Sequence, residues 1–199
     1  MRVKDVLFRW LLQRPIAIDL RNNAVLYAKY HTDALVVCMW IDAAGFFQGA
    51  VVAGMSLQDE PKVIRWIHER VTYNEIADCV VLPGARPDKT EQLRIWNERK
   101  QISAEHPTPR QLITVRKTLY LDAYRLKERP DTVICHSESA KGCLVPVHTD
   151  GFNGTQLLGT VIEDDACGIL HADDQVMIYT LNSILFLDPV LIATKFRYE

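Results

Sequence analysis

The sequence predicts a mixed α/β (α+β) protein in which a meander of strands continues into alternating helices and strands. Three observations support this fold class. Short apolar runs separated by turn residues open the chain, two segments place apolar residues at helical spacing, and a second meander pattern closes the chain. With 48% hydrophobic and 24% charged residues, the composition is that of a globular protein with a buried core.

Residues 1–14 predict an amphipathic helix. Leu7, Trp10 and Leu11 share one helical face, and basic residues occupy the rest. We expect this helix to pack on the domain, and the alternative is a helix resting on anionic lipid. No small-residue cleavage site follows, so we do not expect a signal peptide. No apolar run reaches the roughly 18 residues that span a bilayer.

The first lobe, expected over residues 15–105, begins with strands at Ile16–Leu20 and Ala24–Tyr30. The turn between them contains two asparagines, which tolerate a left-handed backbone. Leu35–Ile41 is almost continuously apolar, as in a strand buried on both faces, and Phe46–Gly54 adds another strand.

Two helices and a strand complete this lobe. Asp59–Val71 has acidic residues and a proline in its first turn and apolar residues at helical spacing, which predicts a helix. Ala77–Leu82 predicts a buried strand, and Asp88–Ile102 predicts a second helix. Ser103–Pro109 contains two prolines and no large apolar residue, so it is the predicted boundary between lobes.

The second, smaller lobe is expected over residues 110–199. Gln111–Leu126 fits a strand and a helix equally well. The architecture of the closing meander repeats that of the opening one, which suggests a duplicated fold. The expected strands are Thr132–Cys135, Cys143–Val147, Cys167–Leu170, Val176–Leu181 and Ile184–Leu187.

Three segments resemble a known family. IAIDLRNNAVLYAKY (16–30), VVLPGARPDKTEQLRI (80–95) and the terminal meander (167–191) are similar to the actin-like assembly proteins of type IV pili, the PilM-like family. They also resemble the cytoplasmic domain of the L component of type II secretion. The resemblance implies a degenerate ribonuclease-H-like/actin-like sheet with flanking helices, arranged in two lobes.

The resemblance also implies a function. Such proteins are non-enzymatic scaffolds at the inner face of the cytoplasmic membrane, and they link an assembly ATPase to inner-membrane platform proteins. We therefore expect a cytoplasmic scaffold that is peripheral to the membrane, either as a single chain or as a homodimer. The formal net charge of −2, without a long basic run, argues against a nucleic-acid partner.

A nucleotide is not expected to bind, and no cofactor is expected. Turns that hold phosphate need glycine, because only glycine lets backbone donors approach closely enough. The turn at 21–23 and the turn at 172–174 contain none. If a nucleotide did bind, Asp19, Asn22, Asn23 and Asp173 would face it.

A ribonuclease-H-like, metal-dependent nuclease is the main alternative. Such an enzyme needs several carboxylates around two metal ions. Asp19, Asp42, Asp164 and Asp165 are the candidates. Turn capping and surface exposure explain the same residues equally well.

Cysteine and histidine residues allow two weaker hypotheses. Cys135, His136, Cys143 and His148 share a CH-x6-C-x4-H pattern, but zinc sites prefer two close pairs of ligands. Ser137 or Ser139 with a nearby histidine would form a nucleophilic pair, but no G-x-S-x-G elbow is present.

The chain has five cysteines, an odd number, and two lie within apolar runs. We expect all five to be free thiols in a reducing compartment. Arg94, Glu98 and Arg99 define the outer face of the helix at 88–102. This face is the candidate surface for docking a partner protein, and a solvated face is the alternative.

Overall fold

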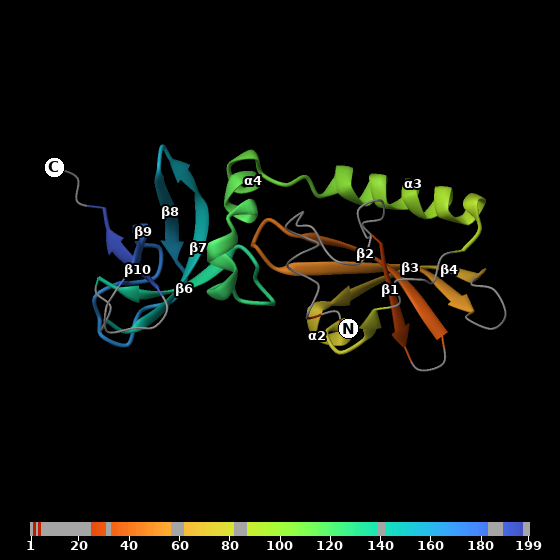
Figure 1. The fold of residues 1–199 in the computed structure, drawn as a ribbon, viewed down its shortest axis with the longest axis horizontal. Helices are drawn as coiled ribbons and strands as arrows, with labels where there is room; N and C mark the ends of the chain where they lie inside the picture. The colour runs from red at the N-terminus through yellow and green to blue at the C-terminus, as the bar shows by residue number, and fades with distance from the viewer. Residues whose placement is uncertain are drawn as a thin grey trace. The chain divides into compact units, whose positions relative to one another are not determined.

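The computed structural model describes residues 2, 4, 25–30, 33–56, 62–81, 87–138, 142–182 and 189–196 (Figure 1). The chain forms two compact units, Met1–Pro107 and Thr108–Glu199, here called the sheet unit and the barrel unit. The division falls within the predicted boundary segment Ser103–Pro109. The strands predicted at Ile16–Leu20 and Ile184–Leu187 lie outside the described residues, as do most of the predicted N-terminal helix and the turn at 21–23.

The sheet unit contains a five-stranded sheet with the order β4-β3-β2-β1-β5, in which every described pair is antiparallel. This arrangement confirms a mixed α+β fold with an opening meander. It does not confirm the actin-like plan, because no parallel strand joins the meander among the described pairs. The strands are β1 (Val25–Tyr30), β2 (Asp33–Ile41), β3 (Phe47–Ser56), β4 (Lys62–Thr72) and β5 (Val80–Val81).

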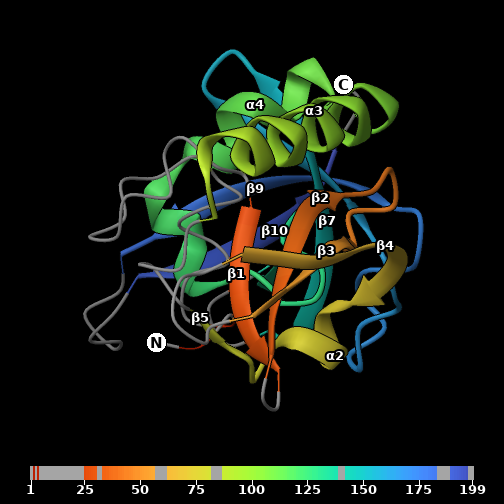
Figure 2. The ribbon, with the colours of Figure 1, turned by 90° about the vertical axis from the view of Figure 1, so that its right-hand side faces the viewer.

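Both faces of this sheet are covered, which explains the near-continuous apolar sequences of β2 and β3. Helix α3 (Lys89–Glu105) lies along one face, where Ile95 packs against buried side chains such as Val36 and Met55 (Figures 1 and 2). On the other face, the short helix α2 (Tyr73–Ile76) packs its Tyr73 and Ile76 among buried residues of β2 and β3.

The helix predicted at Asp59–Val71 is wrong, because residues Lys62–Thr72 form strand β4. Its half-buried apolar side chains are Val63, Trp66, Ile67 and Val71, and their spacing imitates a helix. The register between β3 and β4 shifts at two places, and each shift moves the inward side chains of β4 out of strict alternation. Val63 and Trp66 therefore pack on the α3 side, whereas Ile67 and Val71 pack on the opposite side.

The predicted helix at Asp88–Ile102 is confirmed as α3. Asp88 is its N-cap residue, and its carboxylate Oδ1 accepts hydrogen bonds from the amides of Thr90 (2.7 Å) and Glu91 (2.9 Å). The Glu91 carboxylate in turn accepts the amide of Val63 at 3.1 Å, which ties the start of the helix to β4.

The barrel unit contains a closed barrel with the strand order β10-β6-β7-β8-β9. Five strands of alternating direction leave the first and last strands parallel, so β6 and β10 form the one parallel pair that closes the barrel. Alternate side chains such as Val133, Val147 and Ile178 fill the interior. The strands are β6 (Thr132–Ser137), β7 (Leu144–Asn153), β8 (Gln156–Val161), β9 (Gln175–Leu181) and β10 (Val190–Lys195).

The structure resolves the ambiguity of Gln111–Leu126 in favour of helices. Helix α4 (Arg110–Lys117) is followed by the 3₁₀ helix η1 (Leu119–Ala123). Gly151 permits the contact between α4 and β7, because its φ is +148° and a Cβ atom there would lie 3.1 Å from the Cβ of Gln111.

The predictions for the second lobe were partly correct. The strands expected at Thr132–Cys135, Cys143–Val147 and Val176–Leu181 are confirmed as β6, β7 and β9. The strand expected at Cys167–Leu170 is wrong, because this segment forms turns and bends. Strands β8 and β10 were not predicted. Within the described residues, no helix is long and apolar enough to cross a membrane.

Candidate functional site

One edge of strand β6 pairs with two different segments of the chain. Its first half pairs with the segment after η1, where the amide of Ile134 donates to Tyr124 O and that of Leu126 donates to Thr132 O, both at 2.9 Å. Its second half pairs with β10, where Glu138 N donates to Ala193 O at 2.8 Å. The segment after η1 and strand β10 therefore diverge from a common strand and leave a groove between them on the outside of the closed barrel.

This groove has a volume of about 300 Å³, and we call it the seam groove. Most of its wall is aliphatic. Leu144 stands at its margin with 61% of its surface exposed, so apolar surface continues from the groove to solvent. The lining residues are Ala123, Tyr124, Arg125, Leu126, Ile134, His136, Leu144, Val190 and Leu191.

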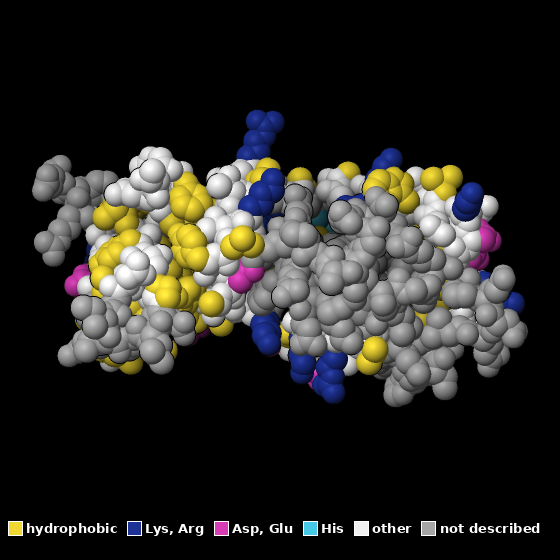
Figure 3. Space-filling model, in the orientation of Figure 1, with side chains coloured by type: hydrophobic (Ala, Val, Ile, Leu, Met, Phe, Trp, Pro, Cys, Tyr) yellow, Lys and Arg dark blue, Asp and Glu magenta, His cyan; other side chains and the backbone are white. Residues whose placement is uncertain are grey.

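Further apolar side chains are exposed on the barrel unit. Tyr179 and Leu181 of β9 are 44% and 36% exposed, and they pair in register with Ile192 and Val190 of β10. Figure 3 shows hydrophobic side chains gathered on the visible face of the barrel unit. Exposed apolar side chains that gather on one face are typical of interaction sites.

The polar groups of the groove hold its walls together. The Tyr124 hydroxyl donates to Pro189 O, which links the segment after η1 to the residue before β10. The Arg125 guanidinium donates to Pro130 O and Val115 O, both at 2.6 Å. The groove therefore offers mainly aliphatic contact to a ligand.

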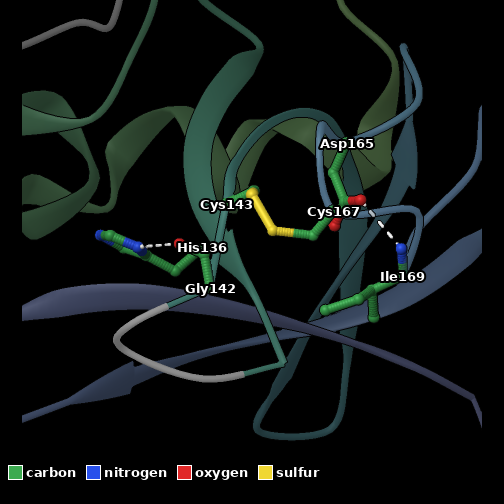
Figure 4. Close-up of a disulfide and its surroundings, with 6 residues drawn as sticks. All are labelled: His136, Gly142, Cys143, Asp165, Cys167 and Ile169. Atoms are coloured by element: carbon green, nitrogen blue, oxygen red, sulfur yellow. Dashed lines mark hydrogen bonds between the residues drawn. A yellow bond between two sulfur atoms is a disulfide. The ribbon is translucent and has the colours of Figure 1, made fainter.

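His136 forms the polar part of the wall near Leu144. Its Nδ1 lies 2.9 Å from Gly142 O (Figure 4). A carbonyl oxygen only accepts, so Nδ1 carries the proton in this contact. This hydrogen bond fixes the orientation of the ring relative to the chain that enters β7.

A buried ion pair anchors the wall on the α4 side. Arg116 donates through Nε and Nη2 to the two carboxylate oxygens of Asp131, at 2.8 and 2.5 Å, and both side chains are buried. The backbone O of Asp131 accepts from the amide and the hydroxyl of Thr149 on β7, at 2.8 and 2.7 Å. Helix α4 and the segment leading into β6 are thus held against the barrel.

The structure corrects the expectation that all five cysteines are free. Cys143 and Cys167 form a disulfide, whereas Cys38, Cys79 and Cys135 are free thiols (Figure 4). The pairing was missed because the two residues are 24 positions apart and meet only when the barrel closes. The argument from unpaired cysteines to a reducing compartment therefore no longer holds.

The same disulfide removes Cys143 from the zinc hypothesis. Cys135 points into the barrel core, while its neighbour His136 lies on the outer face with the seam groove. Among the residues that the structure describes, no group of three or more His, Cys, Asp and Glu side chains is arranged to hold a metal ion.

The serine–histidine pairs are not assembled either. Ser137 is fully buried, and successive residues of a strand face opposite sides, so its hydroxyl and the ring of His136 point apart. His148 also alternates with the inward residues Val147 and Thr149. Ser139 lies outside the described residues.

The candidate carboxylates cap local turns. Asp42 accepts the amides of Ala44 (3.0 Å) and Phe46 (2.9 Å) in the β2–β3 turn. Asp164 accepts the amide of Ala172 at 2.8 Å, and Asp165 accepts that of Ile169 at 2.9 Å. These contacts correspond to the capping role that the sequence analysis kept as an alternative.

The residues proposed to face a nucleotide are mostly outside the described part of the chain, which omits Asp19, Asn22 and Asn23. Asp173 is exposed in the turn before β9, with a φ of +68°. No nucleotide site can be built from it alone.

The proposed helix face is covered by cation–π contacts. Arg94 lies 3.8 Å from the ring centroid of Trp66, and Arg99 lies 4.9 Å from that of Trp96. Glu98 is half-buried beside them. These side chains shield the two tryptophans, so the face is less open than the sequence suggested.

Sequence reasoning missed the seam groove, although one signal was present. The dual character of Gln111–Leu126 reflects a segment that is helical at first and then pairs with β6 at Tyr124–Leu126. No protein-family model, curated protein or solved structure matches this chain.

Proposed function

We propose that the barrel unit is a protein-binding module that takes an apolar side chain of a partner into the seam groove. The observation that supports this function is the seam groove between the segment after η1 and β10, with its aliphatic lining and its exposed margin at Leu144. A volume of about 300 Å³ is at the lower limit for pockets that hold drug-sized ligands, so it suits one or two aliphatic or aromatic side chains. Such buried anchors provide most of the free energy in many interfaces.

The test fills the groove. Ala123 is an exposed lining residue, so Ala123→Trp places an indole ring at the mouth of the groove without disturbing the core. Ala104→Trp adds the same ring to an exposed position of α3 and serves as the matched control. The probe is anilinonaphthalene sulfonate, which binds apolar surface, titrated by fluorescence.

We expect Ala123→Trp to weaken binding of the dye about tenfold, because the indole ring would occupy the space that the dye needs in the groove. The aromatic contact that the dye then loses contributes more than about 1 kcal/mol. Ala104→Trp should bind as the unmodified chain does. Equal affinity in all three proteins would disprove the groove as the binding site.

The resemblance of the sequence supplies the class of partner. We propose that the chain is a non-enzymatic scaffold of a type IV pilus or type II secretion platform, with an assembly ATPase or an inner-membrane platform protein as the partner. The support is the residue pattern at 16–30, 80–95 and 167–191, and an actin-like two-lobe plan belongs to the same proposal. Location at the inner face of the cytoplasmic membrane follows from that role.

Copurification from the native host tests this role. Mass spectrometry should identify an assembly ATPase or a platform protein with the unmodified chain and with Ala104→Trp, and Ala123→Trp should lose it. Recovery of neither class with any of the three chains would end the secretion-platform proposal. The redox state of the disulfide also tests the cytoplasmic location, because disulfides are rare in the reduced cytosol. Alkylation of free thiols in freshly lysed cells measures this state, and a fully oxidised Cys143–Cys167 pair would contradict a cytoplasmic location.

A further inference from the structure

The disulfide lies next to the seam groove in the sequence and in space. Cys143 stands between Gly142, whose carbonyl holds the His136 ring, and Leu144, which lines the groove. Cys167 lies in the connection between β8 and β9. The disulfide therefore ties the entrance of β7 to a different part of the barrel unit (Figure 4).

The entrance of β7 is held closely against β6. Ser137 N donates to Cys143 O at 2.9 Å. A Cβ atom at Gly142 would lie 1.9 Å from Ser137 O, so only glycine fits here. The path of this short segment determines where His136 and Leu144 stand.

The other end of the disulfide has its own support. Asp165 Oδ1 accepts the amide of Ile169 at 2.9 Å, and Asp165 N donates to Leu170 O at 2.9 Å. The amide of Gly168 donates to Asp165 O at 3.2 Å. Both ends of the disulfide thus keep hydrogen bonds of their own, and what cleavage removes is the covalent tie between the entrance of β7 and the β8–β9 connection.

The two cysteines of the disulfide differ in exposure. Cys167 is exposed, whereas Cys143 is half-buried. A thiolate from solution therefore reaches the Sγ of Cys167 first, and the sulfur of Cys143 leaves. The three free thiols are poor nucleophiles at neutral pH, because burial raises the pKa of Cys38 and of Cys135 to about 12, and partial burial together with the nearby Asp78 carboxylate also raises the pKa of Cys79.

We propose that Cys143–Cys167 is a reducible disulfide that controls binding at the seam groove, an inference that rests on the proposed function. A dithiol reductant attacks Cys167 Sγ and forms a mixed disulfide, and the Cys143 thiolate leaves and takes up a proton. The second thiol of the reductant then closes its own disulfide and releases Cys167 as a thiol. Two electrons and two protons pass from the dithiol to the protein.

Reduction leaves the groove wall formed by His136 and Leu144 with its hydrogen bonds to neighbouring chain but without the covalent tie at Cys143. A wall that must be ordered during binding costs free energy that a fixed wall does not. We expect the reduced chain to bind anilinonaphthalene sulfonate about fivefold more weakly than the oxidised chain, since part of the binding free energy is then spent on ordering the wall. The barrel unit should remain folded.

The experiment titrates the full chain with the dye before and after treatment with dithiothreitol. Thiol counting should give three thiols in the oxidised chain and five in the reduced chain. The double variant Cys143→Ser/Cys167→Ser should bind as the reduced chain does and should not respond to dithiothreitol. Cys79→Ser, which removes a free thiol of the sheet unit, should keep the full response.

Three results would overturn the inference. These are equal dye affinity in both redox states, a response that persists in the double variant, or loss of cooperative unfolding of the barrel unit on reduction. The variant Ala123→Trp distinguishes failure of the redox inference from failure of the proposed binding function. Dye binding that is sensitive to Ala123→Trp but insensitive to reduction leaves the groove as a binding site and removes only its redox control.

Discussion

The sheet unit and the barrel unit bury different kinds of side chain. In the sheet unit, two apolar layers cover the two faces of an open sheet, and the charged contacts lie at the surface, as in Arg94 over Trp66. The barrel unit surrounds one apolar core and also contains every buried charged or polar side chain found in the described residues. These are Arg116, Arg125, Asp131, Thr132, Ser137, Thr149 and Asp165.

The difference reflects the size of each apolar core. A closed barrel of fewer than a hundred residues buries a small share of its surface, and small units commonly add crosslinks or specific polar contacts. The barrel unit has both a disulfide and a bidentate buried ion pair. We therefore expect single polar substitutions to damage the barrel unit more than the sheet unit.

The largest expected effect is that of Asp131→Asn. The substitution keeps the shape of the side chain but removes the negative charge that accepts two hydrogen bonds from the buried Arg116 guanidinium. Removal of one partner of a buried ion pair typically costs about 3–5 kcal/mol. Amide hydrogen exchange of β6–β10, followed by mass spectrometry, should show this loss as faster exchange across the whole barrel.

Asp78→Asn is the matched control in the sheet unit. Asp78 accepts hydrogen bonds from Arg2 and Lys4, both at 2.8 Å, but the group is exposed. The same chemical change should therefore leave exchange in β1–β5 almost unaltered. Equal effects of the two substitutions would show that the contrast between the units has no energetic consequence.

The sequence predicted the elements whose signals are local. Apolar runs located β1, β2 and β3, and apolar residues within Asp88–Ile102 located α3. Short apolar runs between turn residues also located β6, β7 and β9. In each of these, the burial pattern depends on neighbouring residues of one segment.

The features that were missed depend on contacts between distant segments. Register shifts in the β3–β4 pair gave β4 the spacing of a helix. The disulfide and the seam groove arise from barrel closure, which brings Cys143 to Cys167 and leaves Tyr124–Leu126 and β10 to share β6. No local pattern records such pairings, so the candidate site itself was not predicted.

A smaller effect is expected for Gly159→Ala in β8. The added Cβ would lie 2.5 Å from His148 O and 2.5 Å from Val147 Cγ1, inside the closed wall of the barrel. Overpacking of this kind costs about 1–3 kcal/mol. Amide hydrogen exchange in β7–β9, followed during thermal unfolding, measures this loss of stability.

Gly54→Ala in β3 tests the same change in the open sheet. Its nearest neighbour is the flexible Arg65 side chain, whose Nε would be 3.1 Å from the new Cβ. Because this side chain can move and alanine lowers the entropy of the unfolded chain, the change should stay below about 1 kcal/mol. A greater loss for Gly54→Ala than for Gly159→Ala would reverse the predicted order of the two units.

The smallest effect is expected for Arg94→Ala in the sheet unit. The guanidinium lies 3.8 Å from the centroid of Trp66, but Arg94 itself is exposed, so its removal should cost about 0.5–1 kcal/mol. Urea unfolding followed by tryptophan fluorescence measures this loss, because all four tryptophans of the chain lie in the sheet unit. Arg94→Lys keeps a cation and should recover part of the stability. If Arg94→Lys recovered no stability, the planar shape of the guanidinium rather than its charge would account for the contact with Trp66. The stability of this surface contact in the sheet unit would then depend on side-chain shape, as the packing of the barrel interior does.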